Sequence, residues 1–194
     1  YFNETFDAYL ATPVASGYRK VLHAEIRGRV SNFFANIQDI FIGVNNFLQG
    51  KFEDGVNDWA RFTFNSTFGL LGIHDVASEM GLEKHNEDFG QPFGRWGVPT
   101  GPYLMLPFLS SSTVRDAAGT AIDWTVAPLT EVRPIALRNT LFGLYLVNTR
   151  AELLDASRIL EEAALDKYVF QRDAYLQRRR SLIYDGSPPR EKYE

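Results

Sequence analysis

The sequence predicts a single-domain, mostly α-helical protein. Apolar residues recur at steps of three and four between residues 33 and 48, which is the spacing of one face of an α-helix. A second apolar stripe follows a T-x-x-E sequence at Thr149 and Glu152, a pattern typical of a helix N-terminus. Alternating apolar and polar runs, which would predict strands, are scarce. With 194 residues the chain is long enough for one domain with its own core.

The predicted helix at 33–48 has two contrasting faces. Opposite its apolar stripe the side chains are mostly Asn and Gln, whereas a surface helix normally carries Lys and Glu there. Ser31 or Asn32 is placed to cap its start. We favour a core helix whose amides bond across contacts with its neighbours; the alternative is a helix that lines a mixed polar and apolar cavity or lies at a lipid interface. The apolar side chains that would then face lipid or the cavity include Phe34, Ile37, Phe41 and Phe47.

A second helix is expected from about Glu53 to Phe68. Acidic residues at its start suit the positive end of the helix dipole. Arg61 and Asn65 lie one turn apart on it and should meet at the helix surface. The glycines of the Gly-Leu-Leu-Gly sequence at 69–72 predict where it stops.

Two solvated helices are predicted at 149–185, and a tail is predicted at 186–194. Residues 150–194 hold 18 charged side chains against 26 in the much longer stretch before them, which is typical of water-exposed helices. The second of these helices starts near Asp166, with Val169, Tyr175, Leu176 and Ile183 facing inward. We favour a solvated face for Arg178–Arg180; contact with lipid headgroups or an acidic partner is the alternative.

Regular periodicity disappears between about 81 and 120, where glycine and proline are frequent. Within this region, the 19 residues of 96–114 contain no charged side chain, yet they are too few and too rich in proline for a membrane-spanning helix. Two other stretches are charge-poor: 30–50, with only Asp39, and 62–74. A long segment without secondary structure is usually functional, so we expect a functional loop here.

Composition narrows the possible functions. The net charge of −4 argues against a nucleic-acid partner, which needs a basic face. The absence of Cys excludes disulfides and thiolate metal sites. No run of 18 or more apolar residues occurs, which argues against a transmembrane helix. Because the chain begins at Tyr1 without a leader, we expect that any targeting segment has been removed.

Catalytic patterns are missing from the sequence. The three histidines, His23, His74 and His85, do not have metal-ligand spacing, and we expect no metal or cofactor. The G-x-S-x-G sequence of nucleophile-elbow esterases is absent. The Asp-Phe-Gly sequence at 88–90 lacks the other elements of a kinase. The sequence therefore predicts a protein that is not an enzyme.

Five motifs occur in an order that matches a known family. The motifs are "YFNETFDAYLATPVASGYRKVL", "VSNFFANIQDIFIGVNNFLQGK", "ARFTFNSTFGLLGIHDVASEMGL", "EDFGQPFGRWGVPTGPYLMLPFL" and "STVRDAAGTAID". Together they resemble the MlaA family, also called VacJ, of Gram-negative outer-membrane lipoproteins. The resemblance is dense over residues 1–125 and looser over the charged C-terminal helices.

This resemblance implies a ring-like helical protein that takes part in retrograde phospholipid transport. Such proteins are anchored by a lipidated Cys, here upstream of Tyr1, and sit in the periplasmic leaflet of the outer membrane beside a trimeric porin. Phospholipids misplaced in the outer leaflet would pass through an amphipathic channel to a periplasmic lipid-carrier protein. Outer-membrane lipid asymmetry is thereby maintained.

The resemblance also assigns roles to residues. The family's Ser-Asn-Phe segment influences channel gating and corresponds to Ser31, Asn32 and Phe33. Its glycine- and proline-containing loop forms a flexible hairpin beside the channel, here at about 97–116. The residues of this loop expected to border the lipid path are Gly101, Pro102, Tyr103, Leu104, Leu106, Pro107 and Phe108.

Two departures from the family pattern affect the loop. Leu109-Ser110-Ser111-Ser112 stands where the family usually has Gly-Pro-Ser, and Pro99 stands where it prefers Gly. Both changes bear on how the loop moves. The alternative to a phospholipid channel is a soluble periplasmic lipid-binding or scaffold protein without a passage, and a lipid hydrolase is a third hypothesis.

Overall fold

The computed structural model describes residues 2–108, 110–164 and 166–189. These residues are mostly helical, as predicted, with one two-stranded antiparallel sheet. The helices are α1 (Phe2–Phe6), α2 (Thr12–Val21), α3 (Ala24–Leu48), α4 (Phe52–Thr67), α5 (Val76–Glu79), α6 (Gly90–Arg95), α7 (Val114–Val126), α8 (Ile135–Ala163) and α9 (Lys167–Ile183). A π-helical turn, Asp7–Ala11, joins α1 to α2, and a 3-10 turn, Pro128–Glu131, follows α7. The strands are β1 (Tyr103–Leu106) and β2 (Ser110–Thr113).

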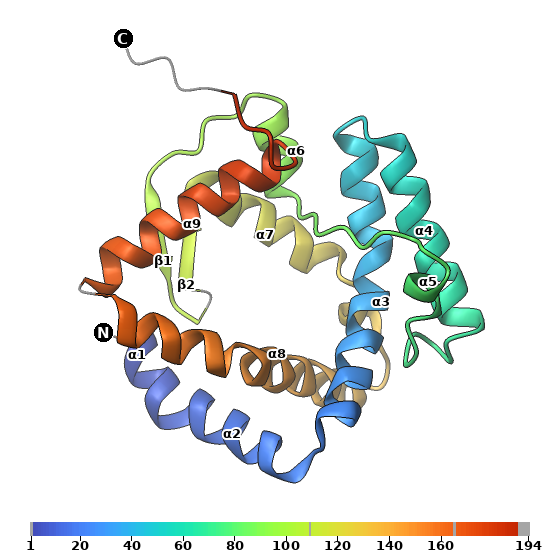
Figure 1. Ribbon diagram of the computed structural model, residues 1–194, viewed down its shortest axis with the longest axis horizontal. Coiled ribbons are helices and arrows are strands. Elements are labelled where there is room, and N and C mark those ends of the chain that lie inside the picture. Colours follow the sequence, from blue (N-terminus) through green and yellow to red (C-terminus); the bar gives the residue numbers. More distant parts are fainter. Residues whose placement is uncertain (1, 109, 165, 190–194) are drawn as a thin grey trace.

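The helices run along the outline of the molecule in Figure 1. α3 and α4 pack side by side on one side, and α9 lies on the opposite side. α2 packs along α8 at a third edge, α7 lies between α9 and α3, and the two strands lie beside α9. Segments from the two ends of the chain are therefore neighbours, because α2 and α8 are far apart in sequence.

The helix α3 is longer than the sequence predicted. It begins at Ala24, after His23 in extended backbone conformation, so neither Ser31 nor Asn32 caps its start. The Ser31 hydroxyl instead donates to the carbonyl of Arg27, 3.1 Å away, one turn earlier in the same helix. Residues 24–30 extend the helix because they contain no helix breaker except one glycine, even though the apolar stripe starts later.

The amide-rich face of α3 is buried against α4. Asn46 donates to Asp58 at 2.7 Å, and Asn36 donates to Ser66 at 2.9 Å. The two helices can approach closely because a Cβ on Gly43 would lie 2.5 Å from the Trp59 ring. The favoured interpretation of this helix, amides bonding across a helix contact, is confirmed.

The predicted helix start at Thr149 is wrong. Thr149 lies inside α8, which begins at Ile135 directly after Pro134. Proline is tolerated before the first helical turn, where its missing N–H has no partner to lose. The T-x-x-E sequence resembles a capping box but lies where the backbone N–H groups are already bonded within the helix.

The buried side chains are more often polar than apolar. Large apolar side chains such as Phe68, Leu71, Phe108 and Trp124 are more than half exposed. Within the part of the chain that the structure describes, no helix is long and apolar enough to cross a membrane. The buried polar and charged residues are Asn36, Asp39, Asn45, Asn46, Gln49, Asp58, Arg61, Asn65, Gln91, Ser112, Thr113, Arg115, Asp116, Asn148 and Arg179.

Arg61 and Asn65 meet, but in the interior rather than at the helix surface. Arg61 is 2% exposed, and its Nη2 atom lies 2.9 Å from both carboxylate oxygens of Asp75. Asn65 donates to the same carboxylate at 2.9 Å. Although burial alone would raise it, the hydrogen bonds from Ser78, Asn65 and Arg61 lower the pKa of Asp75 to about 2. The turn after α4 folds back so that Asp75 reaches both side chains.

Replacing Arg61 by alanine should strongly destabilise the protein. The substitution leaves the Asp75 carboxylate and the buried Asp39 without the guanidinium, and loss of one partner of a buried pair costs about 3–5 kcal/mol. Denaturant unfolding of the purified protein measures this loss. As a control, Arg19→Ala removes a surface pair with Asp155 and should leave the unfolding midpoint nearly unchanged. Equal effects of the two substitutions would contradict the buried network's role.

Candidate functional site

The segment predicted as a structureless loop contains a β-hairpin. β1 and β2 pair antiparallel, with Tyr103 opposite Thr113 and Leu106 opposite Ser110. The charge-free window also contains the first residue of α7, Val114. Periodicity missed these strands because each has only four residues, and β2 consists entirely of Ser and Thr, so no apolar alternation marks it. The family resemblance, in contrast, predicted a hairpin at about 97–116, and the strands lie within those bounds.

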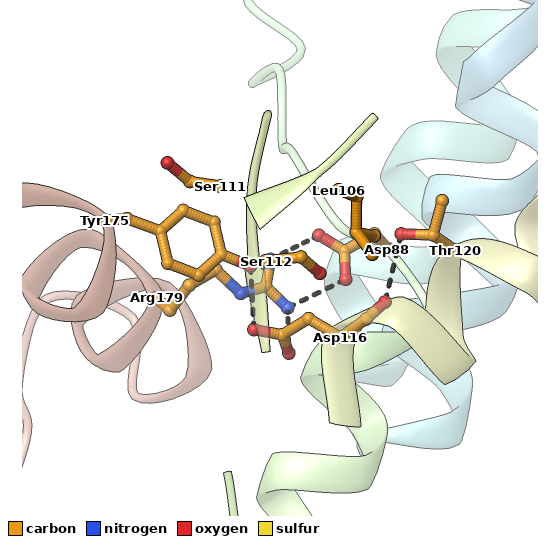
Figure 2. Close-up of a pocket in the computed structure, with 8 residues that line it drawn as sticks. All are labelled: Asp88, Leu106, Ser111, Ser112, Asp116, Thr120, Tyr175 and Arg179. Atoms are coloured by element: carbon orange, nitrogen blue, oxygen red, sulfur yellow. Dashed lines mark hydrogen bonds and ion pairs between the residues drawn. The ribbon is translucent and has the colours of Figure 1, made fainter. Parts of the chain in front are cut away.

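A polar pocket of about 230 Å³ lies beside the hairpin (Figure 2). It is lined by Leu106 of β1 and by the β2 residues Ser111 and Ser112. α7 contributes Asp116 and Thr120, and α9 contributes Tyr175 and Arg179. Asp88, which precedes α6, completes the lining. The residues are thus drawn together from four separate parts of the chain.

Arg179 is the centre of this pocket's hydrogen-bond network. Its Nη2 atom donates to Asp88 Oδ1 at 2.9 Å and to Asp116 Oδ1 at 3.0 Å, and Nη1 donates to the other Asp88 oxygen (Figure 2). Because Arg179 is only 7% exposed, the prediction that Arg178–Arg180 form a solvated face is wrong for this residue. The sequence contained a signal for its burial, since Tyr175 and Ile183, both predicted to face inward, lie one turn away on either side.

The ionisation of the pocket follows from these contacts. Burial would raise the pKa of Asp116, but the charges of Arg179 and Arg115 outweigh it and hold that pKa below its usual range. Burial and the Asp116 charge raise the pKa of Tyr175, whose hydroxyl donates to Asp116 at 2.9 Å. Neutral Tyr175 therefore serves as a donor to an ionised carboxylate at neutral pH.

The same elements fix the base of the hairpin. Tyr103 donates to Ser111 across the strands at 2.9 Å, and its ring packs edge-on against Tyr168 and Tyr175 of α9. The Thr113 hydroxyl accepts from the Asp116 N–H at 3.2 Å and so caps α7. The base of the hairpin is therefore bound to α7 and α9, which are together called its platform.

The remaining predicted loop residues lie along the hairpin. Gly101 has φ +70°, a left-handed conformation that suits glycine, and Pro102 leads into β1. Leu104 and Leu106 lie on one face of β1, and both are half-buried. Pro107 and Phe108 are exposed in the turn.

The Ser31–Phe33 segment lies in the middle of α3 and contacts other elements. Asn148 of α8 donates to the Ser31 hydroxyl at 2.8 Å, and the carboxylate of Glu152, also on α8, is an alternative acceptor to the Arg27 carbonyl for the single proton of this hydroxyl. Asn32 donates to the carbonyl of Ile73, 3.4 Å away, in the turn after α4. The segment thus bonds to α8 and to that turn, whereas the hairpin bonds to α7 and α9.

The four apolar residues predicted on one face of α3 have different surroundings. Phe34 is buried and packs edge-on against the Tyr145 ring of α8, 5.2 Å between centroids. Phe47 packs against Trp59 of α4 at 5.0 Å. Ile37 and Phe41 are half-buried. Phe34 and Phe47 therefore hold α3 to its neighbours.

The histidines do not form a metal site in the described residues. His85, in the segment after α5, has Nδ1 2.9 Å from Oδ1 of Asp58 on α4. Asp75, next to His74, accepts hydrogen bonds from the guanidinium of Arg61. No group of three or more His, Asp or Glu side chains in the described ranges is arranged to hold a metal ion.

Replacing Asp123 by asparagine should stabilise the protein at neutral pH. Burial and the nearby Asp88 carboxylate raise the pKa of Asp123 to about 6. The folded state therefore favours the protonated carboxyl, so the wild type loses stability as pH rises from about 4 through 6, while the amide variant does not. Thermal unfolding at about pH 4 and pH 7.5 should show a gain for the variant only at the higher pH. The same gain at both pH values would contradict this assignment.

Comparisons with known proteins place this architecture in one family. The family model described as "MlaA lipoprotein" matches residues 1–182. The "Intermembrane phospholipid transport system lipoprotein MlaA" of Escherichia coli (strain K12) is 35% identical over 185 residues, which cover 93% of this chain and 72% of the relative. The protein of the same name from Haemophilus influenzae is 27% identical over 192 residues, with coverage of 93% and 73%.

A solved structure agrees with the sequence comparisons. A chain from the study "Structural basis for maintenance of bacterial outer membrane lipid asymmetry" superimposes with a TM-score of 0.79 and 31% identity. The match covers 94% of this chain and 96% of that chain. Because the family model, the curated relatives and the solved structure all match nearly the whole chain, the chain belongs to the MlaA lipoprotein family.

Proposed function

We propose that the protein transports phospholipid from the outer membrane toward the periplasm and so maintains outer-membrane lipid asymmetry. Membership in the MlaA family supports this proposal, since the E. coli and Shigella flexneri relatives are named as lipoproteins of an intermembrane phospholipid transport system. In this proposal the protein is lipid-anchored on the periplasmic side, lies beside a trimeric porin and passes lipid to a periplasmic carrier. It performs no catalysis.

The observation that carries the proposal is the distribution of polarity in the fold. Amide and ionic side chains fill contacts between helices, and large apolar side chains such as Leu70, Trp96 and Val126 are exposed. A protein lying in a lipid leaflet needs an apolar outer surface for acyl chains, because exposed apolar area is otherwise unfavourable in water. Paired polar groups inside allow a headgroup to pass without the full cost of removing its charge from water.

In this mechanism the helices surround an amphipathic passage, and the hairpin borders it. Leu104 and Leu106 present apolar side chains to acyl chains from a strand whose base is fixed on α7 and α9. Ser31–Phe33 controls opening through its bonds to α8 and to the turn after α4. The exposed apolar residues of α4 and of that turn contact lipid.

Behaviour toward membranes separates this function from the soluble alternative. The purified chain should require detergent to remain monodisperse and should bind liposomes made of phosphatidylethanolamine and phosphatidylglycerol, because its exposed apolar side chains partition into acyl chains. A chain that stays monodisperse in buffer and ignores these liposomes would support a lipid-binding or scaffold protein without a passage. Release of fatty acid from the same liposomes over many turnovers would support the hydrolase.

A charge on the lipid-facing side of β1 should block transport without unfolding the protein. Moving a charge into hydrocarbon costs roughly 2.5–3.5 kcal/mol, so Leu104→Glu should slow lipid passage by about 100-fold. The variant is expressed in E. coli that lacks its own relative, and resistance to detergent with EDTA is measured together with helical content.

Leu104→Met is the matched control, because it keeps an apolar side chain of similar size at the same position. This variant should retain most of the resistance. Normal resistance in cells that carry Leu104→Glu would contradict a role for this face of the hairpin.

A further inference from the structure

The tip of the hairpin is held by α1, which lies about 100 residues earlier in the sequence. Asn3 Nδ2 donates to the carbonyl of Leu106 at 2.8 Å, and the N–H of Phe108 donates to Asn3 Oδ1 at 3.0 Å. One side-chain amide therefore satisfies a backbone acceptor and a backbone donor on the two sides of Pro107. The amide of Asn suits this contact because it carries an NH₂ donor and a C=O acceptor on two separate atoms of one uncharged group.

Aromatic contacts surround the same point. The Phe108 ring packs edge-on against Phe2 and Phe6 of α1, with centroids 5.1 and 5.0 Å away and interplanar angles of 89° and 90°. The Phe108 backbone has φ +64°, which is unfavourable for a bulky residue and persists only where the surroundings require it. The Asn3 bonds and the two rings are the contacts that meet this requirement.

The tip is attached more weakly than the base. The base is bound to a network in which Arg179 and Asp116 are buried. In contrast, α1 has no buried residue, and Phe108 remains 67% exposed even with both rings beside it. Exposed contacts open at lower free energy than buried ones, so the hairpin is expected to release first at its tip.

The segment that carries α1 is itself fixed just beyond the helix. Asp7, the next residue after α1, binds Arg150 of α8 through two contacts, 2.6 Å to Nε and 2.7 Å to Nη2. Thr12 donates to Asp7 at 3.0 Å and also accepts from Arg150 at the same distance. α1 is thus anchored just beyond its C-terminal end, and Asn3 lies in its first turn.

We infer that α1 is a clasp for the hairpin tip and that Asn3 is its positioning residue. The clasp holds Leu104 and Leu106 in one position, and its opening lets the tip move away from α1 while the base stays in place. The effect on lipid flow rests on the proposed function, since the hairpin matters to transport only if it borders the lipid route.

Hydrogen exchange of the purified full chain in detergent tests the clasp. Asn3→Ala should speed exchange in peptides covering 103–113 by about tenfold, the change expected from losing two modest hydrogen bonds. Asn3→Asp should have a larger effect, because a carboxylate at this position repels the Leu106 carbonyl. Exchange in α7 should stay unchanged, which distinguishes release of the tip from general unfolding.

Asn57→Ala is the matched control. Asn57 also donates its side-chain amide to a backbone carbonyl, that of Glu83 at 2.6 Å, but far from the hairpin in the sequence. This variant should leave exchange at 103–113 as in the wild type. Wild-type exchange of the hairpin in both Asn3 variants would overturn the clasp.

A cross-link tests the consequence for transport. The chain has no Cys, so Asn3→Cys with Pro107→Cys creates a unique pair that a short bismaleimide can join. In E. coli cells lacking their own relative, the joined pair should lower clearance of outer-leaflet phospholipid at least fivefold relative to the same variant left unjoined. Equal clearance with the hairpin joined and unjoined would overturn the effect of tip release on transport.

The two readouts separate this inference from the proposed function. If the wild type clears no outer-leaflet phospholipid, the proposed function fails, and hydrogen exchange still decides whether α1 holds the tip. If the wild type clears lipid but exchange at 103–113 does not respond to Asn3, the clasp fails and the proposed function stands.

Discussion

Pairing of buried charged and amide side chains is the constraint on which the rest of the structure depends. Arg179 on α9 binds Asp88 before α6 and Asp116 on α7, so one guanidinium joins three segments distant in sequence. Arg61 acts in the same way between α4 and the turn that contains Asp75. An unpaired buried charge is strongly unfavourable. This cost favours the arrangement of helices in which Arg61 and Arg179 reach their carboxylate partners.

Because polar side chains fill much of the interior, many large apolar side chains lie at the surface. Among the described residues few large apolar side chains are fully buried, and Phe34, Ile42 and Ile183 are examples. Most of the others remain exposed, which in water would favour aggregation. In a lipid leaflet the same side chains would contact acyl chains, and the free-energy cost of exposing apolar surface to water would be absent. The polarity pattern and the family's membrane-associated character thus have one physical explanation.

The hairpin contacts both the buried polar network and exposed apolar side chains. At its base the Tyr103 ring packs against Tyr175, which belongs to the buried polar network, and its strands contain no charged residue. Its tip depends on exposed aromatic and amide contacts with α1. A strand pair with one strongly fixed and one weakly fixed end can move as a unit about its base without disturbing the platform of α7 and α9.

The sequence by itself determined the helical class, the amide-rich face of α3 and the family, because these depend on local periodicity and on motif order. It also located the loop that contains the hairpin. Tertiary structure alone decided that Arg61 and Arg179 are buried, that Thr149 lies inside a helix, and that Asn3 meets the hairpin tip. Thr149 lies inside a helix because α8 already begins at Ile135. The other three outcomes depend on partners up to 105 residues away, and the spacing of residues along one segment carries no information about such partners.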